Sequence, residues 1–292
     1  MGFDLNGRVA MVTGGSRGLG RVYARTFAVA GAVVAVTGRS VGQVRETVQL
    51  IEAAGGRAIP VSFDVADPEA VEHAVDEIQA QLGTVDVLVN NAGVGGPFDY
   101  LWEVDPESWW QTFEVNVRGT FLCSRAVLPG MIQRGGGRII NLASHAGVFR
   151  WPTASAYSVS KAAVIKLTEN LAVELKRHKI YVFAFHPGLV DGGMTHAALA
   201  ADAVSDSPAH RTNTWIREQH EAGHIVPPEL AAESILFLAS GGADALSGRY
   251  LTVFDDLVAL SARADTIRRD DLLTLRLRQE AANSSGAPFR GA

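Results

Sequence analysis

The stretch Thr13-Gly14-Gly15-Ser16-Arg17-Gly18-Leu19-Gly20 follows the apolar run of residues 9–12 and precedes a helical pattern from Leu19 to Ala30. This order predicts a strand, a tight turn and a helix. Glycines at such a turn let the backbone approach a pyrophosphate, whose charge is met by free N–H groups at the helix N-terminus. Glycines also mark ordinary turns, so the interpretation as a dinucleotide site needs support from the rest of the chain.

Outward from this turn, strand and helix patterns alternate along the chain. Apolar strand patterns cover residues 32–37, 58–63, 85–89, 138–142, 180–185 and 249–253. Helical patterns cover residues 41–51, 105–133, 153–177 and 228–239, and another helix begins at Asp67. Continuously apolar strands that alternate with helices predict a parallel sheet covered on both faces. Since no linker divides the chain, we expect one doubly wound α/β domain over residues 1–253.

Two segments break this rhythm. Residues 189–226 are Ala-rich and irregular, and a loop of that length in a compact domain is usually functional. Residues 254–292 form a C-terminal extension with a helical pattern from Asp256 to Ile267. The alternation of Leu273, Leu275 and Leu277 with polar residues predicts a short extended piece with one face packed. We expect residues 283–292 to be disordered.

Composition excludes several classes of protein. The 292 residues carry 26 Lys and Arg against 31 Asp and Glu, so the net charge of −5 argues against a nucleic-acid partner. The single cysteine allows no internal disulfide, and there is no Cys/His spacing for a metal site. The longest strongly apolar stretch, residues 27–37, is too short to span a bilayer, and the N-terminus is unlike a signal peptide. We therefore expect a cytoplasmic protein without a membrane partner.

A second motif stands on the helix predicted over residues 153–177. Tyr157 and Lys161 are four residues apart and share one helix face. An ammonium beside a phenol favours the phenolate and so lowers the tyrosine pKa. Such a tyrosine can exchange a proton with a substrate oxygen. The alternative, a surface Tyr and Lys without a role, stays open for the pair taken alone.

The ordered combination of motifs resembles the short-chain dehydrogenase/reductase family in its form of roughly 250 residues. The pattern T-G-x-x-x-G-x-G at residues 13–20 is followed by Asn90-Asn91-Ala92-Gly93, Asn116, Ser144, the Tyr157–Lys161 pair and Pro187-Gly188. The resemblance covers residues 6 to about 253. It implies a Rossmann-like sheet and an enzyme that moves a hydride between a nicotinamide and a ketone or secondary alcohol.

The resemblance also implies roles for four residues. Tyr157 would be the acid or base at the substrate oxygen, and Lys161 would lower its pKa and hydrogen-bond the nicotinamide ribose. Ser144 would hold the substrate oxygen and stabilise developing charge. Asn116 would fix a water that links Lys161 to solvent. For Asn116 the alternative of a helix-kink residue that bonds the backbone stays open, and both roles can coexist.

A larger set of residues would bind the cofactor. They are Gly14, Ser16, Arg17, Gly18, Leu19 and Gly20 in the glycine turn, Arg39 and Ser40 after the second strand, Asp64 and Val65 after the third, Asn91, Ala92 and Gly93 after the fourth, Pro187, Gly188 and Val190 after the sixth, and Tyr157 with Lys161. Asp64 would meet the adenine, although it is also a candidate turn residue.

The end of the second strand favours NADP(H) over NAD(H). Members that bind NAD usually carry an acid at the position of Gly38, where the carboxylate accepts hydrogen bonds from the ribose 2′-hydroxyl and repels a 2′-phosphate. Here Arg39 follows instead, and its guanidinium can grip a phosphate with paired donors. Arg17 adds a second positive charge. The alternative is that Arg39 is an ordinary solvated charge.

The substrate side of the site is less conventional. The usual Thr four residues beyond Gly188 is Gly192, so a contact to the cofactor is missing or comes from Thr195. Five residues are candidates to line the substrate pocket: His145, Phe149, Trp151, Leu189 and Met194. Packing roles stay open for the first three. This set, with Phe98 and no evident Arg clamp, indicates a small, largely apolar ketone or alcohol as substrate.

Two further expectations concern assembly and class. The aromatic helix around Trp109 and Trp110, together with the resemblance, predicts a homo-oligomer, most simply a tetramer. The tail from Leu257 to Leu277 would then pack over a subunit boundary or over residues 189–226. A catalytically weak NADP-binding regulator and a non-redox relative on the same fold are the alternatives to an oxidoreductase.

Overall fold

The computed structural model describes residues 3–200 and 204–277. Seven parallel strands form one sheet in the order β3-β2-β1-β4-β5-β6-β7. The strands are β1 (Val9–Val12), β2 (Val33–Gly38), β3 (Arg57–Ser62), β4 (Val87–Asn90), β5 (Gly137–Leu142), β6 (Ile180–His186) and β7 (Tyr250–Thr252). The predicted doubly wound, Rossmann-like sheet is confirmed. The strand order reverses between β1 and β4, which is where such sheets bind ligands.

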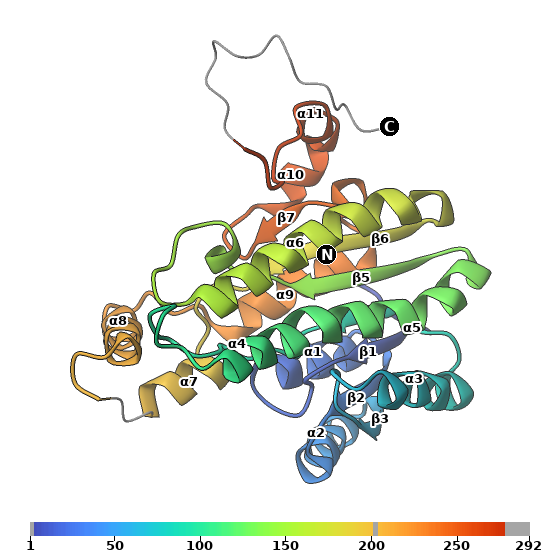
Figure 1. Cartoon of the computed structure of the whole chain (residues 1–292). Helices are drawn as coiled ribbons and strands as arrows, with labels where there is room; N and C mark the ends of the chain where they lie inside the picture. The colour runs from blue at the N-terminus through green and yellow to red at the C-terminus, as the bar shows by residue number, and fades with distance from the viewer. Residues whose placement is uncertain (1–2, 201–203, 278–292) are drawn as a thin grey trace.

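Helices cover both faces of the sheet because successive strand residues point to opposite sides (Figure 1). Ala10 and Val12 of β1 join the core beneath α1 (Gly18–Val29), α2 (Val41–Ala53) and α9 (Pro228–Ser240). Val9 and Met11 join the core beneath α3 (Pro68–Leu82), α5 (Gly119–Arg134) and α6 (Ser155–Leu175). Both faces being buried explains why the strands read as continuous apolar runs.

The helix expected over residues 105–133 is divided into three parts. Asp105 accepts a hydrogen bond from the Ser108 N–H and begins α4 (Pro106–Phe113). A π-helical turn, Glu114–Arg118, then leads into α5. Such turns insert one residue into the helical ladder and frequently occur at functional sites. This one contains Asn116.

The segment of residues 189–226 is more regular than expected. It contains α7 (Gly193–Ala200) and α8 (Pro208–Glu221), which lie together at one end of the molecule (Figure 1). A parallel bridge between Val190 and Val226 closes its base, with Val226 N–H donating to Leu189 O at 2.8 Å. The prediction of an irregular segment is wrong because Ser207, which accepts from the His210 N–H, caps a helix that the composition obscured.

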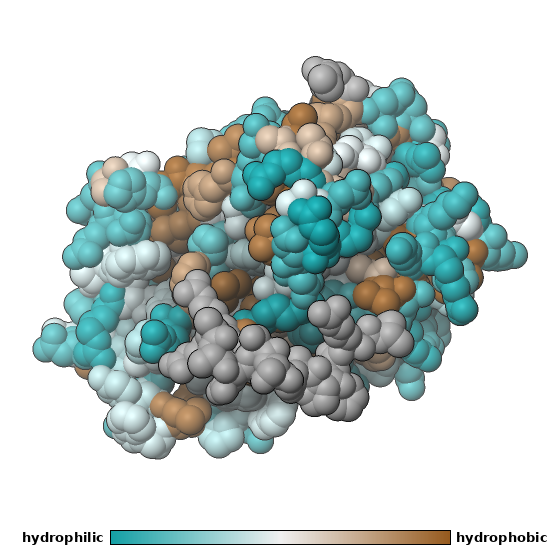
Figure 2. All heavy atoms as spheres, turned by 90° about the horizontal axis from the view of Figure 1, so that it is seen from above, coloured by the Kyte–Doolittle hydropathy of each residue, from teal (hydrophilic) through white to brown (hydrophobic). Residues whose placement is uncertain are grey.

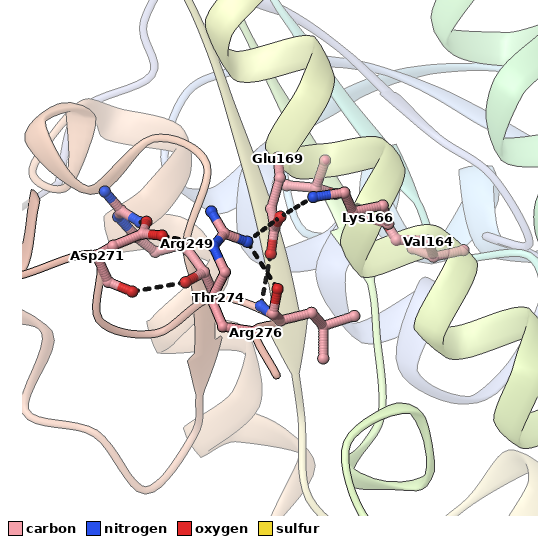
Figure 3. A network of polar contacts seen from close by, with 9 residues as sticks. Val164, Lys166, Glu169, Arg249, Asp271, Thr274 and Arg276 are labelled. Carbon is pink, nitrogen blue, oxygen red and sulfur yellow. Dashed lines mark hydrogen bonds and ion pairs between the residues drawn. The ribbon is translucent and has the colours of Figure 1, made fainter. Parts of the chain in front are cut away.

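The described part of the C-terminal extension packs against β7 and α6 of the same chain. It begins with α10 (Leu257–Ala262) and α11 (Ala264–Arg269), which agrees with the helical pattern. Beyond them, Leu273 O accepts from Tyr250 N–H of β7, and Leu275 N–H donates to Glu169 of α6. Figure 3 shows Glu169 with Lys166 of the same helix and Arg276 of the tail. Leu273 and Leu275 pack against the core but Leu277 is exposed, so the predicted one-sided packing holds for two of the three leucines.

Polar contacts fix this tail. Glu169 accepts from Lys166 and Arg276, both at 2.8 Å, and from the Leu275 N–H at 2.7 Å. Burial acts to raise the pKa of Glu169, but these donors outweigh it and hold the pKa below its ordinary value. The polar contacts that fix the tail, the tail clamp, are therefore made to α6 and β7 and not to the described part of residues 189–226, and the tail's expected position at a subunit boundary stays a prediction. The segment expected to be disordered, 283–292, lies outside the described residues.

The surface seen from above Figure 1 shows hydrophobic residues in separate groups between hydrophilic ones (Figure 2). Larger exposed apolar side chains stand on α4 and α6, where Trp110 is 57% exposed and Val173 71% exposed. Within residues 3–200 and 204–277, no helix has the length and apolar content needed to cross a membrane.

Candidate active site

The glycine turn connects β1 to α1 at the point where the strand order reverses. Gly14 and Gly18 have φ angles of +63° and +52°, which other residues adopt only with strain. A Cβ on Gly20 would collide with Gly14 O. Arg17 precedes α1 without a side-chain hydrogen bond to the first turn of that helix, so the N–H groups of the turn face no capping side chain. Because no side chain fills these positions and the N–H groups are free, the turn has the space and the donors that a pyrophosphate needs.

Neighbouring β4 holds the turn in place. Thr13 Oγ1 accepts from the N–H groups of Asn91 and Ala92, both at 3.0 Å. Asn91 Nδ2 donates to Thr13 O at 2.9 Å. A Cβ on Gly14 would stand 3.0 Å from Ala92 Cα, so the turn and the end of β4 pack without room for a side chain. Asn91 and Ala92 thus lie where the sequence placed them and also support the turn.

The ends of β2 and β3 bring two further candidates together. Arg39 Nη1 lies 4.0 Å from Asp64 Oδ2, and the Arg39 side chain is 68% exposed. Asp64 Oδ1 also accepts from Ala66 N–H, which is the turn role left open for it. Ser40 precedes α2 and forms no side-chain cap. An exposed guanidinium at this edge is free to turn toward a ligand, because so distant a surface pair contributes little free energy.

Other cofactor candidates have evident packing roles. Leu19 packs against the core beneath α1, and Val65 is buried on the other face of the sheet. A Cβ on Gly119 would stand 2.7 Å from the Val65 side chain, so α5 approaches this loop closely. Ser16 lies against Gly38, where an added Cβ would be 3.2 Å from its hydroxyl. Packing and cofactor contact by backbone atoms are compatible at these positions.

Asn116 occupies the π-helical turn and is 1% exposed. Its Oδ1 accepts from Val94 N–H and its Nδ2 donates to Val94 O, both at 2.9 Å. Nδ2 also donates to Ser160 Oγ at 3.0 Å. The side chain therefore has the backbone-bonding role that was the alternative for Asn116, and it ties the loop after β4 to the helix that carries Tyr157 and Lys161.

Ser144 stands at the end of β5 and begins a short 3₁₀ turn, His145–Gly147. Its hydroxyl accepts from Ala146 N–H at 3.2 Å and lies near enough to the Tyr157 phenol to influence the pKa of that group. Gly147 makes this approach possible, since a Cβ there would come within 2.7 Å of the α6 backbone at Lys161 and Ala162. The turn thus presses Ser144 against the face of α6 that presents Tyr157.

Tyr157 and Lys161 share a face of α6, as the spacing predicts. Lys161 Nζ lies 5.6 Å from the centre of the Tyr157 ring and donates to Leu142 O at 2.7 Å. Burial lowers the pKa of Lys161 to about 8 and raises the pKa of Tyr157, although the Ser144 hydroxyl opposes the rise. The expected lowering of the Tyr157 pKa by Lys161 is wrong for this structure, because desolvation of the phenol dominates.

The substrate-side candidates fall into two groups. Trp151 packs edge to face against Tyr157, with ring centres 6.4 Å apart, and also contacts Phe98. Gly95 lies near both Phe98 and Met194, which brings α7 to the same wall. Phe149 instead packs on His145 and is exposed. Trp151 and Met194 therefore lie near the reacting group, and Phe149 lies at its edge.

The loop after β6 places its three cofactor candidates at the base of residues 189–226. Gly188 has a φ of +83°, and a Cβ there would stand 2.5 Å from the Val226 side chain. Pro187 is partly buried, Val190 pairs with Val226, and Leu189 is partly buried beside them. Gly192 has open space around it, whereas Thr195 is buried. A Cβ on Gly18 would be 3.2 Å from Gly193 Cα, so this loop touches the glycine turn.

Sequence patterns missed a polar cluster behind Ser144. His145 Nδ1 lies 2.8 Å from Tyr250 OH, and the His145 and His186 rings are 4.1 Å apart. Burial, the nearby His145 and the charge of Lys161 lower the pKa of His186 to about 3. His186 and Tyr250 come from adjacent strands of the sheet, so only the fold reveals their proximity.

Comparison with known proteins gives a consistent result. The profile of the short chain dehydrogenase family matches residues 8–203. The chain is 36% identical over 278 residues to "Short chain dehydrogenase mpl6" of Monascus purpureus, which covers 93% of this chain and 89% of that protein.

Two solved structures share the fold. A gluconate 5-dehydrogenase from Burkholderia cenocepacia, in complex with NADP and tartrate, is 31% identical with a TM-score of 0.76, and the match covers 88% of this chain and 97% of that one. A 7α-hydroxysteroid dehydrogenase complexed with NADH and 7-oxo glycochenodeoxycholic acid is 30% identical with a TM-score of 0.75. That match covers 86% of this chain and 94% of the other.

Proposed function

The chain belongs to the short-chain dehydrogenase family and is an oxidoreductase of that family, and from this premise we propose that it interconverts a ketone and a secondary alcohol with NADP(H). The observation that carries the proposal is the meeting of Ser144, Tyr157 and Lys161 beside the glycine turn. These side chains come from β5 and α6. A regulator that only binds a dinucleotide would have no use for a serine hydroxyl beside a buried phenol.

The proposed cofactor site runs along the carboxyl edge of the sheet. Gly14, Gly18 and Gly20 with the start of α1 would hold the pyrophosphate, and the end of β4 would lie beside the adenine ribose. Residues 187–190 would shape the nicotinamide pocket. When bound there, the nicotinamide supplies or accepts the hydride. The proposed domain limits are residues 1–253 for the catalytic domain and residues 254–292 for the extension.

Tyr157 is proposed as the group that moves the proton. Its raised pKa keeps the phenol protonated, which is the form that donates to a carbonyl oxygen during reduction. Ser144 would hold the same oxygen and stabilise the charge that develops on it. Lys161, buried and held by Leu142 O, would orient the cofactor ribose and supply positive charge when the alcohol is oxidised. Asn116 would keep the loop after β4 against α6.

A preference for NADP(H) rests on Arg39. Its guanidinium is exposed at the end of β2, and the only acid near it among the described residues is Asp64 at 4.0 Å. The position that precedes it, Gly38, carries no carboxylate to repel a 2′-phosphate. Relatives of known structure bind NADP in one case and NADH in the other, so the family permits either cofactor.

The protein is further proposed to be a homo-oligomer, most simply a tetramer. Exposed apolar side chains on neighbouring helices support this: Trp110 of α4, Phe121 of α5 and Val173 of α6. Solution scattering at micromolar concentration distinguishes an oligomer from a compact monomer, and a monomer overturns the assembly.

A turnover screen tests the proposed function. The purified protein is mixed with NADPH and a panel of ketones, or with NADP⁺ and the matching alcohols, and nicotinamide absorbance is followed. Substrate-dependent change in absorbance supports the proposal. Dinucleotide binding without turnover of any substrate instead supports the regulator, and substrate conversion at constant absorbance supports a non-redox relative.

A further inference from the structure

A pocket of about 420 Å³ opens next to the aromatic wall of the site. That volume lies within the range of ordinary small-molecule pockets. Its walls come from the loop after β4, the turn before α6 and helix α8. They comprise Tyr100, Trp151, Pro152, Thr153, Pro208, Arg211, Thr212 and Trp215. A second hollow, of about 460 Å³ around Asp191 and Glu229, contains none of the candidate catalytic residues.

Arg211 is the only charged side chain among those walls. It donates to Tyr100 OH at 2.9 Å and to the backbone oxygen of Asp206, and its guanidinium lies 5.8 Å from the Tyr100 ring centre. Both acceptors are uncharged, and no carboxylate lies within 4.0 Å of it in residues 3–200 and 204–277. Among the described residues, the guanidinium is thus held in place without a carboxylate beside it. Such a group suits a carboxylate, which it can bind through paired hydrogen bonds.

Trp151 connects this pocket to the reacting group. Its ring contacts Tyr157 at 6.4 Å on one side and Trp215 at 5.9 Å on the other, measured between ring centres. These distances place the Tyr157 and Trp215 rings at most about 12 Å apart, with Trp151 in contact with both. A ligand that reaches from Tyr157 into the pocket therefore passes along the Trp151 ring. The indole rings of Trp151 and Trp215 would pack against a flat or alicyclic ring system.

We propose that this pocket is a subsite for the far end of the substrate, in which Arg211 binds a carboxylate while Trp151 and Trp215 hold the ring system that precedes it. The substrate class is a ring-containing oxo or hydroxy acid. This assignment rests on the proposed function for the reaction at Tyr157, but binding at Arg211 is separate from that reaction. It replaces the expectation of a small apolar substrate without an arginine contact.

Binding of an unreactive pair of probes tests the subsite. Isothermal titration calorimetry on the full-length protein compares 2-naphthoate with 2-naphthamide, which has the same shape without the charge. A charged hydrogen bond at this exposed group should make 2-naphthoate bind about tenfold more tightly. Arg211→Gln should abolish that preference, whereas Arg211→Lys should retain part of it. Arg217→Gln, an exposed arginine of the same helix, should leave the preference unchanged.

The subsite is overturned by equal binding of the two probes, by undetectable binding of 2-naphthoate at millimolar concentration, or by equal losses in Arg211→Gln and Arg217→Gln. Arg211→Lys tests whether Arg211 binds the carboxylate itself or only holds the loop that carries Tyr100. Lysine keeps the positive charge but cannot make the paired hydrogen bonds of a guanidinium. A support role without a charge contact predicts that Arg211→Lys loses the preference completely, and that result also rejects the proposal.

A turnover arm separates this inference from the proposed function. Reduction of the neutral ketone 2-tetralone by NADPH reports on Tyr157 without requiring Arg211. Turnover of 2-tetralone with no Arg211-dependent carboxylate preference leaves the oxidoreductase in place and rejects the subsite. An Arg211-dependent preference for 2-naphthoate without turnover of any ketone supports the subsite and rejects the proposed function.

Discussion

Replacing Arg39 by leucine should remove most of the preference for NADPH. A hydrogen bond to a charged group contributes about 1.5–3 kcal/mol, and the 68% exposure of Arg39 places its contribution near the lower end. About 1.4 kcal/mol corresponds to a factor of ten. We therefore expect kcat/KM for NADPH to fall about tenfold in Arg39→Leu, mainly through KM, with the value for NADH nearly unchanged.

The assay is steady-state kinetics with both cofactors at one fixed ketone concentration. Arg25→Leu makes the same change of net charge on an exposed face of α1 and should alter neither value by more than about twofold. Adding Gly38→Asp to Arg39→Leu should reverse the preference, with a small shift of Ser16, whose hydroxyl would lie 3.2 Å from the new Cβ. A wild type that prefers NADH, or equal losses for both cofactors in Arg39→Leu, refutes the reasoning.

Three further predictions concern the glycine turn, the tail and the buried histidine. Gly20→Ala should weaken dinucleotide binding at least tenfold in a fluorescence titration, because the new Cβ meets Gly14 O. In Gly42→Ala the new Cβ points into open space, so the affinity should not change. Equal affinities of the two variants contradict this prediction. Arg276→Gln should lower the free energy of unfolding by about 1–2 kcal/mol, because the hydrogen bond to Glu169 is lost. Arg269→Gln removes only a surface ion pair and should change the free energy of unfolding by under about 0.5 kcal/mol. Equal decreases in melting temperature for the two variants contradict the tail clamp. The His186 pKa of about 3 lies below the value in the unfolded chain, so the unfolded state binds the proton first as pH falls below about 6.5. Stability should therefore drop by up to about 1.4 kcal/mol per pH unit, and His186→Asn should flatten this dependence in denaturant titrations between pH 7 and 4.5, unlike the exposed His73→Asn; an unchanged slope is the contrary result.

The arrangement of the sheet could be predicted from sequence because local signals agree with it. Buried strands read as apolar runs, and Asp67 caps α3 by accepting from the N–H groups of Glu69 and Ala70, as its position before Pro68 indicates. The glycine turn could also be predicted, since its glycines stand where a side chain would be strained or would collide with a neighbouring atom. Site residues that belong to these motifs, such as Ser144 and Tyr157, therefore meet as expected.

Contacts between distant segments could not be predicted in the same way. His145, His186 and Tyr250 come from three separate segments, and nothing in their local sequences indicates a shared cluster. The tail clamp joins Glu169 to Arg276, which are 107 residues apart. The direction of the Tyr157 pKa shift also depends on burial, which spacing does not give. Helical spacing places Lys161 beside the phenol but says nothing about solvent.

The most direct test of the central claim is the turnover of Tyr157→Phe. This change removes the phenol hydroxyl and keeps the ring that packs on Trp151. Losing a general acid should lower kcat by about 10²–10⁴-fold, while the dissociation constant for NADPH, measured by titration on the same variant, stays within about twofold. Retention of more than about a tenth of the wild-type kcat contradicts the assignment of Tyr157 as the group that moves the proton.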